Sequence, residues 1–301
     1  MNNLPFAKSG SWYKGNIHTH STNSDGAKTP REVCAYYKRK KYNFISLTDH
    51  FLANYDYPIT DSTIFRTNTF TTLLGAELHA PKTSLGYDWH ILAVGLPKDF
   101  SPLKPRETGV KLAARASAAG AYVAVAHPRW YDLTDNDVIS LKTANAIEIS
   151  NSTANINNGK SDSGGYLDRL LSQGRYYHSV ATDDAHFHDK MPDFGLNWLM
   201  VKCQSLDPDA ILNALHEGSF YSSQGPEIFH VKAVKGKKLK VETSPVRVIR
   251  ITGEGSSNSS VISKQDITYG ELDLSRLKGG FARITVTDSH GRHAWCNPIQ
   301  L

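Results

Sequence analysis

The sequence is poor in cysteine and contains no long apolar run. Its three cysteines, Cys34, Cys203 and Cys296, lie far apart, without the paired spacing of a zinc knuckle or a disulfide framework, so we expect reduced thiols in or near the core. No run approaches the roughly 20 apolar residues of a membrane span, and the first eight residues lack the apolar core of a signal peptide. We therefore expect a cytoplasmic protein without a membrane partner.

The chain also carries only a small excess of positive over negative charge. A net charge of +5 over 301 residues favours small anionic substrates only weakly, and the densest basic stretch, residues 38–41, fits the exposed C-terminus of a helix. This distribution argues against a long nucleic acid as the partner. The length and a hydrophobic content of 40% allow one large domain and a small one.

Short β-branched or aromatic runs alternate with helix-like stretches from about residue 15 to residue 225. The predicted strands are residues 15–18, 44–48, 71–76, 90–96, 121–126, 146–150, 179–182 and 198–201. Thr29, Pro30 and Glu32 form an N-cap, a helix-starting proline and a capping box, which predict a first helix. Residues 112–119 and 209–216 are further helix candidates. The alternation predicts an α/β fold with βα units around a mainly parallel sheet.

The pattern changes after about residue 226, where alternating strands replace the helical periodicity. These strands are expected at residues 229–234, 239–241, 246–251 and 282–286, with turns rich in Gly, Ser and Asn such as residues 253–258. We therefore expect a barrel over residues 1–225 and a small all-β, Ig-like domain that resembles a β-sandwich over residues 226–301.

Histidines and carboxylates recur at or beside the ends of the predicted strands. They are His18, His20, Asp25, Asp49, His50, Glu77, His90, His127, Asp184 and His186. One isolated histidine is usually structural, but so many polar groups at one end of a barrel would be costly without partners. An H-x-H pair on an extended segment places both imidazoles on the same side, and Glu77 is placed to bridge two ions. The pattern predicts a multinuclear metal site, although His90 begins its run and needs a hairpin or a reversed strand.

Seven of these motifs, in this order, resemble the polymerase and histidinol phosphatase (PHP) family. They are His18-Thr19-His20, Ser24-Asp25-Gly26, Thr48-Asp49-His50, Glu77, His90, Ala126-His127-Pro128 and Asp184-Ala185-His186. The end of the chain, residues 283–288 and 294–298, resembles the tail of the CehA/McbA-like branch. The resemblance implies a distorted seven-stranded, TIM-like (β/α) barrel that holds two or three divalent ions of zinc, manganese or iron.

The resemblance also implies which side chains hold each ion. His18, His20, Glu77 and Asp184 would hold the first ion; Glu77, His90 and His127 the second; Asp25, His50 and His186 the third. Asp183 would then lie behind the ligands, and Asp49 would either orient His50 or support the local turn. His79 follows Glu77 at a ligand-like spacing that the family does not use, so hydrogen bonding or substrate contact is its expected role.

Such a site implies hydrolysis of a small phosphate ester. Ions that share a carboxylate lower the pKa of a bridging water to about 7, and the resulting hydroxide would attack phosphorus. Glu77, Asp184 and His186 would take part in catalysis, and Arg129 near the rim is a candidate phosphate clamp, although it also fits a surface arginine. The substrate would be the phosphomonoester of a nucleotide or another small metabolite.

Two other functions stay open. The same centre could hydrolyse a carbamate or carboxylic ester, which a tighter aromatic pocket would favour. The aromatic candidates are Tyr55, Tyr57, Tyr87, Trp89, Trp130 and Tyr131. Alternatively, the chain could be a non-catalytic, metal-stabilised binding module, against which the complete ligand set argues. The C-terminal strands could cover the pocket or form a homo-oligomer.

Overall fold

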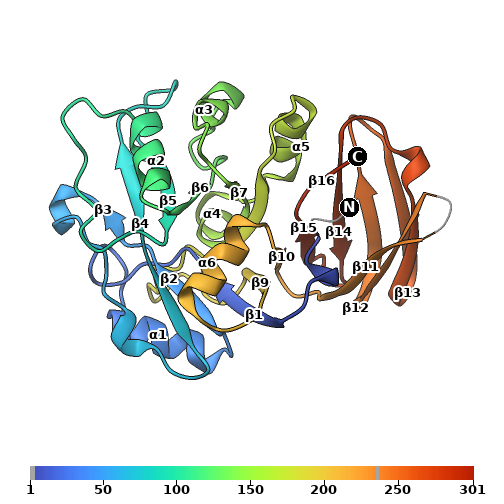
Figure 1. Ribbon diagram of the computed structural model, residues 1–301, viewed down its shortest axis with the longest axis horizontal. Coiled ribbons are helices and arrows are strands. Elements are labelled where there is room, and N and C mark those ends of the chain that lie inside the picture. The colour runs from blue at the N-terminus through green and yellow to red at the C-terminus, as the bar shows by residue number, and fades with distance from the viewer. Residues whose placement is uncertain (1–3, 235–236) are drawn as a thin grey trace.

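The computed structural model describes residues 4–234 and 237–301, and it shows a mixed α/β protein (Figure 1). Residues 1–3, part of the segment inspected for a signal peptide, lie outside the described residues. The helices are α1 (Pro30–Arg39), α2 (Gly109–Ala118), α3 (Asp135–Ser140), α4 (Ser152–Asn158), α5 (Gly164–Ser172) and α6 (Pro208–His216). No helix among the described residues is long and apolar enough to cross a membrane.

The strands of the first 225 residues confirm the predicted alternation. They are β1 (Ser11–Asn16), β2 (Phe44–Leu47), β3 (His50–Phe51), β4 (Thr71–Ala80), β5 (Trp89–Val94), β6 (Tyr122–Val125), β7 (Ala146–Asn151), β8 (His178–Thr182), β9 (Trp198–Cys203) and β10 (Phe220–Ser223). The strands that follow are β11 (Ile228–Val234), β12 (Lys238–Thr252), β13 (Asn258–Asp273), β14 (Phe281–Thr287), β15 (His293–Cys296) and β16 (Ile299–Gln300). Short 3-10 turns lie at Pro5–Ala7, Ala53–Tyr55, Thr63–Phe65 and Leu274–Arg276.

One large sheet joins these strands. Its order is β11-β12-β14-β15-β10-β9-β1-β2-β4-β5-β6-β7-β8. The pairs β1–β2, β2–β4, β6–β7 and β7–β8 are parallel, whereas β5 is antiparallel to both neighbours. This reversed strand is the arrangement that the position of His90 required.

The expected closed barrel of seven strands is not confirmed, because the sheet does not close. Both edges of β10 are already used, by β9 on one side and β15 on the other, so β8 has no free backbone edge to join. The hydroxyl of Ser222 in β10 fills the gap instead. It accepts a hydrogen bond from the Ala181 amide at 3.0 Å and donates one to the Ser179 carbonyl at 2.6 Å.

Local signals in the sequence place the first helix correctly. The Thr29 hydroxyl accepts from the Glu32 amide at 3.3 Å, and the Glu32 carboxylate accepts from the Thr29 amide at 2.9 Å, so the predicted capping box is present. Val33, Cys34 and Tyr37 form the buried face of α1. This face packs against Ile45 and Leu47 of β2.

The strands after residue 226 enclose an apolar core of their own, which includes Val241, Ile249, Ile284 and Val286. In Figure 1 they form the orange and red end of the molecule, beside β10. They are not fully separate, because β15 pairs with β10, and Phe281 and Trp295 pack into the core around α5. The division at residue 225 therefore stays a prediction. The three cysteines are unpaired and buried, in agreement with the expectation.

Candidate metal centre

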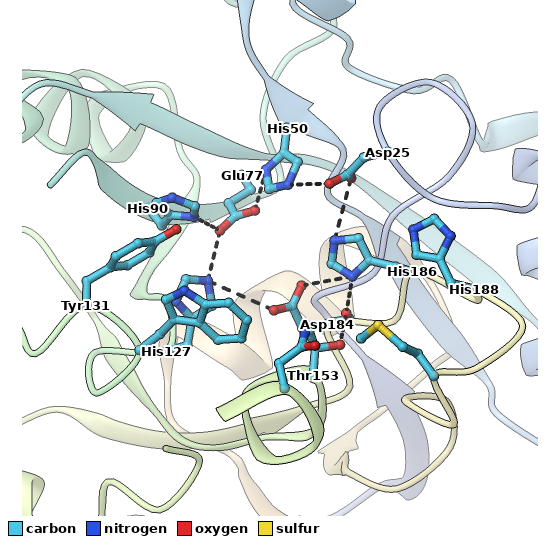
Figure 2. A pocket seen from close by; sticks show the side chains of 13 residues that line it. Asp25, His50, Glu77, His90, His127, Tyr131, Thr153, Asp184, His186 and His188 are labelled. Atoms are coloured by element: carbon cyan, nitrogen blue, oxygen red, sulfur yellow. Dashed lines mark hydrogen bonds and ion pairs between the residues drawn. The ribbon is translucent and has the colours of Figure 1, made fainter. Parts of the chain in front are cut away.

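The ends of the strands bring the predicted histidines and carboxylates together around one cavity of about 320 Å³ (Figure 2). His18 and His20 follow β1, His50 opens β3, Glu77 and His90 lie in β4 and β5, His127 follows β6, and Asp184 and His186 follow β8. His18 and His20 are fully buried beneath the cavity, and the others line it together with Asp25. The structure therefore gathers all nine predicted ligands.

Glu77 lies at the centre of the cluster, and its two carboxylate oxygens face different groups. Its Oε1 lies 2.8 Å from His90 Nδ1 and 3.2 Å from His127 Nε2. Its Oε2 lies 3.6 Å from the Nε2 atoms of both His18 and His20. A carboxylate with this placement can bridge two cations.

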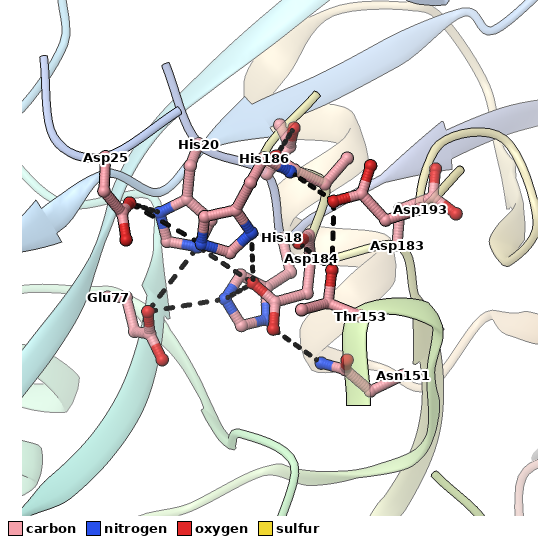
Figure 3. Close-up of polar contacts among 12 residues, drawn as sticks. His18, His20, Asp25, Glu77, Asn151, Thr153, Asp183, Asp184, His186 and Asp193 are labelled. Atoms are coloured by element: carbon pink, nitrogen blue, oxygen red, sulfur yellow. Dashed lines mark hydrogen bonds and ion pairs between the residues drawn. The ribbon is translucent and has the colours of Figure 1, made fainter. Parts of the chain in front are cut away.

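The side chains of the first group are almost completely buried, and Figure 3 shows the contacts among them. The Nε2 atoms of His18 and His20 lie 3.1 Å and 2.9 Å from Asp184 Oδ1, so the H-x-H pair points to one place as predicted. Among the described residues, His18 Nε2 and Glu77 Oε2 are buried and make no well-aligned hydrogen bond, although Asp184 Oδ1 and His50 Nδ1 lie 3.1 Å and 2.7 Å from them. Leaving a buried polar atom unpaired is costly, and imidazole and carboxylate together form a donor set for zinc, manganese or iron. The residues present therefore fit a divalent cation.

The third group surrounds Asp25. Its Oδ2 lies 3.2 Å from His50 Nε2, and its Oδ1 lies 3.5 Å from His186 Nε2 and 3.7 Å from His20 Nδ1. His186 Nδ1 donates to the Asp184 carbonyl at 2.7 Å, so its Nε2 is the nitrogen that faces Asp25. This arrangement agrees with the predicted third ligand set.

The geometry groups the ligand atoms partly as predicted, in the set of His18, His20 and Glu77, and partly in other combinations. Ligand atoms lie within 4.8 Å of one another in four sets: His20, Asp25, His50 and His186; His50, Glu77, His79 and His90; His18, His127 and Asp184; and His18, His20 and Glu77. His127 is thus close to the first group as well as to Glu77. His79 reaches the cluster through His50, at 2.8 Å between His79 Nε2 and His50 Nδ1.

Backbone strain accompanies two of the site residues. His127 and Asp184 have φ angles of 24° and 55°, which residues with a Cβ rarely adopt. The His127 amide donates to the Glu148 carboxylate at 2.7 Å, and the Asp184 amide donates to the His18 carbonyl at 2.9 Å. These bonds hold the sharp turns that direct both side chains into the cluster.

Glu148 is a site residue that sequence reasoning missed. It is fully buried in β7, and its Oε1 accepts from His18 Nδ1 at 2.7 Å and from the Thr182 hydroxyl at 2.5 Å. Its Oε2 accepts from the His127 amide and from the Asn151 side chain, at 2.7 Å and 2.9 Å. A lone carboxylate inside the apolar run of a predicted strand was the signal that could have identified it.

Asp49 supports the local turn, one of its two expected roles. It accepts from the Ser21 amide at 2.7 Å and from the hydroxyls of Ser24 and Thr60 at 2.9 Å and 2.6 Å. These bonds hold the loop that carries Asp25.

Asp183 faces away from the cavity. It accepts from the amides of Gly195, Leu196 and Asn197 at 2.7–2.9 Å, and burial raises its pKa to about 6. It therefore shapes the loop that leads into β9 rather than the cluster itself.

Arg129 does not reach the cavity. Its guanidinium donates to the Asp162 carbonyl at 3.1 Å and lines a separate surface hollow, so the structure gives its expected role as a phosphate clamp no support. The lining residues, all within the described part of the chain, include no lysine or arginine. A tight turn after His127 carries the arginine outward, because the Trp130 amide donates to the His127 carbonyl.

Two of the aromatic candidates line the cavity. Trp130 and Tyr131 form one wall, with the Tyr131 ring 4.7 Å from the His90 ring, and Met191 lines the same cavity. Tyr87 extends this wall, 5.5 Å from Tyr131. The remaining candidates contact other parts: Tyr55 lies 6.4 Å from the His50 ring, whereas Trp89 is buried in the core and Tyr57 packs against it.

Neighbouring charges decide which buried groups stay ionised. Burial lowers the pKa of His50, but Glu77 and Asp25 outweigh it and raise that pKa to about 11. The pKa of His186 rises to about 9, since Asp25 and Asp184 outweigh burial in the same way. Burial opposes ionisation of Glu77, but the nearby histidines hold its pKa well below the usual range. Burial, with the nearby His186 and His50, instead lowers the pKa of His20 to about 4. Without ions, His50 and His186 therefore carry the compensating protons, which metal binding would release.

Comparison with known proteins gives a match to the fold. No family model matches the chain, and no curated protein matches it. A two-domain protein from Bacteroides vulgatus, which contains a predicted PHP-like metal-dependent phosphoesterase, is similar over 97% of this chain and 95% of its own, with a TM-score of 0.55 and 14% identity.

Two other solved structures match with lower scores. A candidate metal-dependent phosphoesterase from Bifidobacterium adolescentis has a TM-score of 0.46 and 15% identity, over 67% of this chain and 96% of its own. An amidohydrolase from Chromobacterium violaceum, with bound sulfate and no metal, has a TM-score of 0.44 and 14% identity, over 57% and 87%. The likeness to the Bacteroides vulgatus structure shows that this chain shares the overall fold of that two-domain protein.

Proposed function

We propose that this protein is a metal-dependent phosphoesterase of the PHP family, in its CehA/McbA-like branch, and that it hydrolyses the phosphomonoester of a nucleotide or another small metabolite. The observation that carries the proposal is the position of Glu77, whose two oxygens face separate groups of imidazoles. Among the described residues, the buried His18 Nε2 and Glu77 Oε2 of the first group make no well-aligned hydrogen bond, which leaves both lone pairs available to a cation.

The chain offers ligands for two or three divalent ions of zinc, manganese or iron. They are His18, His20, Glu77 and Asp184 for the first, Glu77, His90 and His127 for the second, and Asp25, His50 and His186 for the third. When bound, such ions would polarise the phosphoryl group of the substrate and lower the pKa of a coordinated water.

The residues of the chain itself hold this machinery in place. Glu148 accepts a hydrogen bond from His18 Nδ1, and the Asn151 side chain donates one to the Asp184 carboxylate at 3.1 Å. These bonds keep the His18 and Asp184 side chains in one orientation. Thr153 donates to the Asp184 carbonyl at 2.6 Å and lines the cavity. A volume of about 320 Å³ is at the lower end for ligand sites and suits a small ester.

A second candidate is hydrolysis of a carbamate or carboxylic ester at the same centre. The aromatic wall of Trp130 and Tyr131, with Met191 and without lysine or arginine among the described lining residues, favours a flat and uncharged substrate. A phosphomonoester would instead depend on the ions alone to balance its charge.

Product formation separates the two candidates. Protein reconstituted with manganese or zinc is given nucleotide and sugar monophosphates, and in parallel aryl carbamates and aryl esters. We expect metal-dependent release of inorganic phosphate, reduced more than about a hundredfold in Glu77→Gln because the bridging carboxylate is lost. His290→Ala, an exposed histidine far along the chain, is the matched control and should keep wild-type release.

The other results decide between the alternatives. Turnover of carbamates or esters without phosphate release would replace the phosphoesterase proposal with the second candidate. Metal binding without turnover of either set would identify a metal-stabilised binding module. We also propose a cytoplasmic location, which the free and buried cysteines support.

A further inference from the structure

His79 is a buried histidine that the proposed ligand sets do not use. It lies in β4, two residues after Glu77, and only 7% of its surface is exposed. Its Nε2 lies 2.8 Å from His50 Nδ1, a hydrogen-bond distance, and 4.0 Å from Glu77 Oε2. Because β3 pairs with β4 in parallel, His50 stands beside Glu77 in the ladder, and this register brings the ring of His79 against that of His50.

The two nitrogens of His50 face different neighbours. Nε2 is directed at Asp25, 3.2 Å away, as Figure 2 shows, and Nδ1 is directed at His79 and at Glu77 Oε2, 2.7 Å away. If Nε2 offers its lone pair to a cation, the neutral ring carries its proton on Nδ1 and needs an acceptor there.

Two other histidines of the cluster meet the same need with an oxygen. His18 Nδ1 lies 2.7 Å from the Glu148 carboxylate, and His186 Nδ1 lies 2.7 Å from the Asp184 carbonyl. Such partners fix the tautomer and the ring orientation of a ligand. Two acceptors lie near His50 Nδ1. Glu77 Oε2 is one, but it also faces His18 and His20 and belongs to the proposed first ligand set. His79 Nε2 is the other, and its only hydrogen-bond partner among the described residues is His50.

We propose that His79 is a positioning residue: it accepts the Nδ1 proton of His50 and so aims His50 Nε2 at the group formed with Asp25 and His186. The inference rests on the proposed function, because it takes the third ligand set from it. A direct bond from His79 to an ion is the competing role, since His50, Glu77, His79 and His90 also lie within ligand reach of one another. The separation of 2.8 Å between the two nitrogens fits a hydrogen bond and leaves His50 Nε2 free.

The test compares two substitutions. His79→Gln keeps a side-chain acceptor, and His79→Leu keeps the bulk but has none. Zinc alone is titrated into each metal-free variant against a fluorescent chelator, with His50→Ala as the reference for full loss of the third ion and thermal unfolding as the check of folding. We expect the third ion to bind about 10- to 100-fold more weakly in His79→Leu, with the other ions unchanged and His79→Gln close to wild type.

A spectroscopic measurement adds a readout that a merely structural role would not change. In protein labelled with ¹⁵N-histidine, an N–H···N bond gives a scalar coupling between His50 Nδ1 and His79 Nε2, which must be present in the wild type. Absence of this coupling overturns the proposal.

The titration distinguishes failure of this inference from failure of the proposed function. A wild-type chain that binds no zinc overturns the proposed metal centre, and this inference with it. A wild-type chain that binds one or two ions, or a His79→Leu variant that binds the third ion as tightly as the wild type, overturns the role of His79 alone. Loss of an ion other than the third in His79→Leu also overturns it, because His79 would then be a ligand.

Discussion

Glu148 shows how one buried side chain can hold together the cluster that we propose as a metal centre. All four groups that it contacts are donors: the imidazole of His18, the hydroxyl of Thr182, the amide of His127 and the side-chain amide of Asn151. The carboxylate therefore orders three segments, β1, β6 and β8, around one anion. A buried anion with four donors is strongly favoured over a neutral group of the same shape.

The substitution Glu148→Gln tests this role. The amide nitrogen must face one of the four donors, so we expect zinc to bind to the first group about 10- to 100-fold more weakly, together with a lower melting temperature. Glu271→Gln, on an exposed strand, is the matched control. Equal zinc affinity in wild type and Glu148→Gln would contradict the assigned role.

At the scale of single residues, the sequence predicted which histidines and carboxylates gather in the cluster but not the groups that hold them. The H-x-H pair, Asp25 and Asp184-Ala185-His186 were recognisable because strand ends converge in an α/β fold. Glu148 acts on His18, which is 130 positions away in the chain, so its role depends on the arrangement of strands. Arg129 was misplaced for the same reason, because the turn after His127 decides its direction.

Among the elements, the antiparallel placement of β5 matters most for the site. The ladder between β4 and β5 puts His79 opposite His90 and Glu77 opposite Leu92. His90 can reach Glu77 only because the strand runs backwards, which the position of His90 at the start of its run indicated. Helices α3, α4 and α5 were not predicted, since α3 and α4 are only 6 and 7 residues long and carry a weak periodic pattern.

Strand β8 begins with His178, whose burial makes stability depend on pH. Burial, and then the nearby His216, lower its pKa to about 4, and the Tyr122 hydroxyl lies 3.1 Å from its Nδ1. In the unfolded chain His178 binds a proton at about pH 6.5, and in the folded chain only near pH 4. The stability that depends on neutral His178 is therefore fully present above pH 6.5 and is lost as the pH falls from 6.5 to 4.

Between pH 7 and pH 5, the free energy of unfolding should fall by about 2 kcal/mol less in His178→Gln than in the wild type. Urea unfolding at the two pH values measures this difference. The contribution of the other histidines cancels in this difference. The exposed His290→Gln is the control and should follow the wild type. Parallel pH profiles for wild type and His178→Gln would contradict the prediction.

In the whole molecule, the strands after residue 226 are fastened to the rest by more than the ladder between β10 and β15. Arg283 in β14 is 6% exposed, and its guanidinium forms two bonds to Asp168 in α5, at 2.9 Å and 2.8 Å. Phe281 and Trp295 pack into the same core as Leu167 and Leu170. This shared packing makes the two parts depend on each other.

The substitution Arg283→Met should therefore lower the free energy of unfolding by about 2–4 kcal/mol, because it leaves Asp168 without its partner at a largely buried contact. Arg247→Met is the matched control. Arg247 forms an exposed pair with Asp266 at 2.7 Å, and its loss should cost less than about 1 kcal/mol. Equal losses for the two variants in urea unfolding would contradict this account of the contact.

At this scale the sequence predicted where most strands lie along the chain but not how the sheet ends. Runs of apolar residues mark most of the buried strands, because a buried strand is apolar whatever its neighbours are. The sequence did not predict β3, β10, β13, β15 and β16. Closure depends on which edges are left free, and β10 gives both of its edges to β9 and β15. That pairing joins residues more than 70 positions apart, such as Tyr221 and Cys296, and no local pattern records it.

The central claim is that this cluster of histidines and carboxylates is a metal centre organised around Glu77. The most direct measurement is the metal content of the chain after reconstitution with zinc or manganese and removal of loosely bound ions, in the wild type and in Glu77→Gln. The account predicts two or three ions per wild-type chain and fewer in the variant, because one carboxylate serves two groups. A wild-type chain that retains no ion, or a variant that retains as many as the wild type, would contradict it.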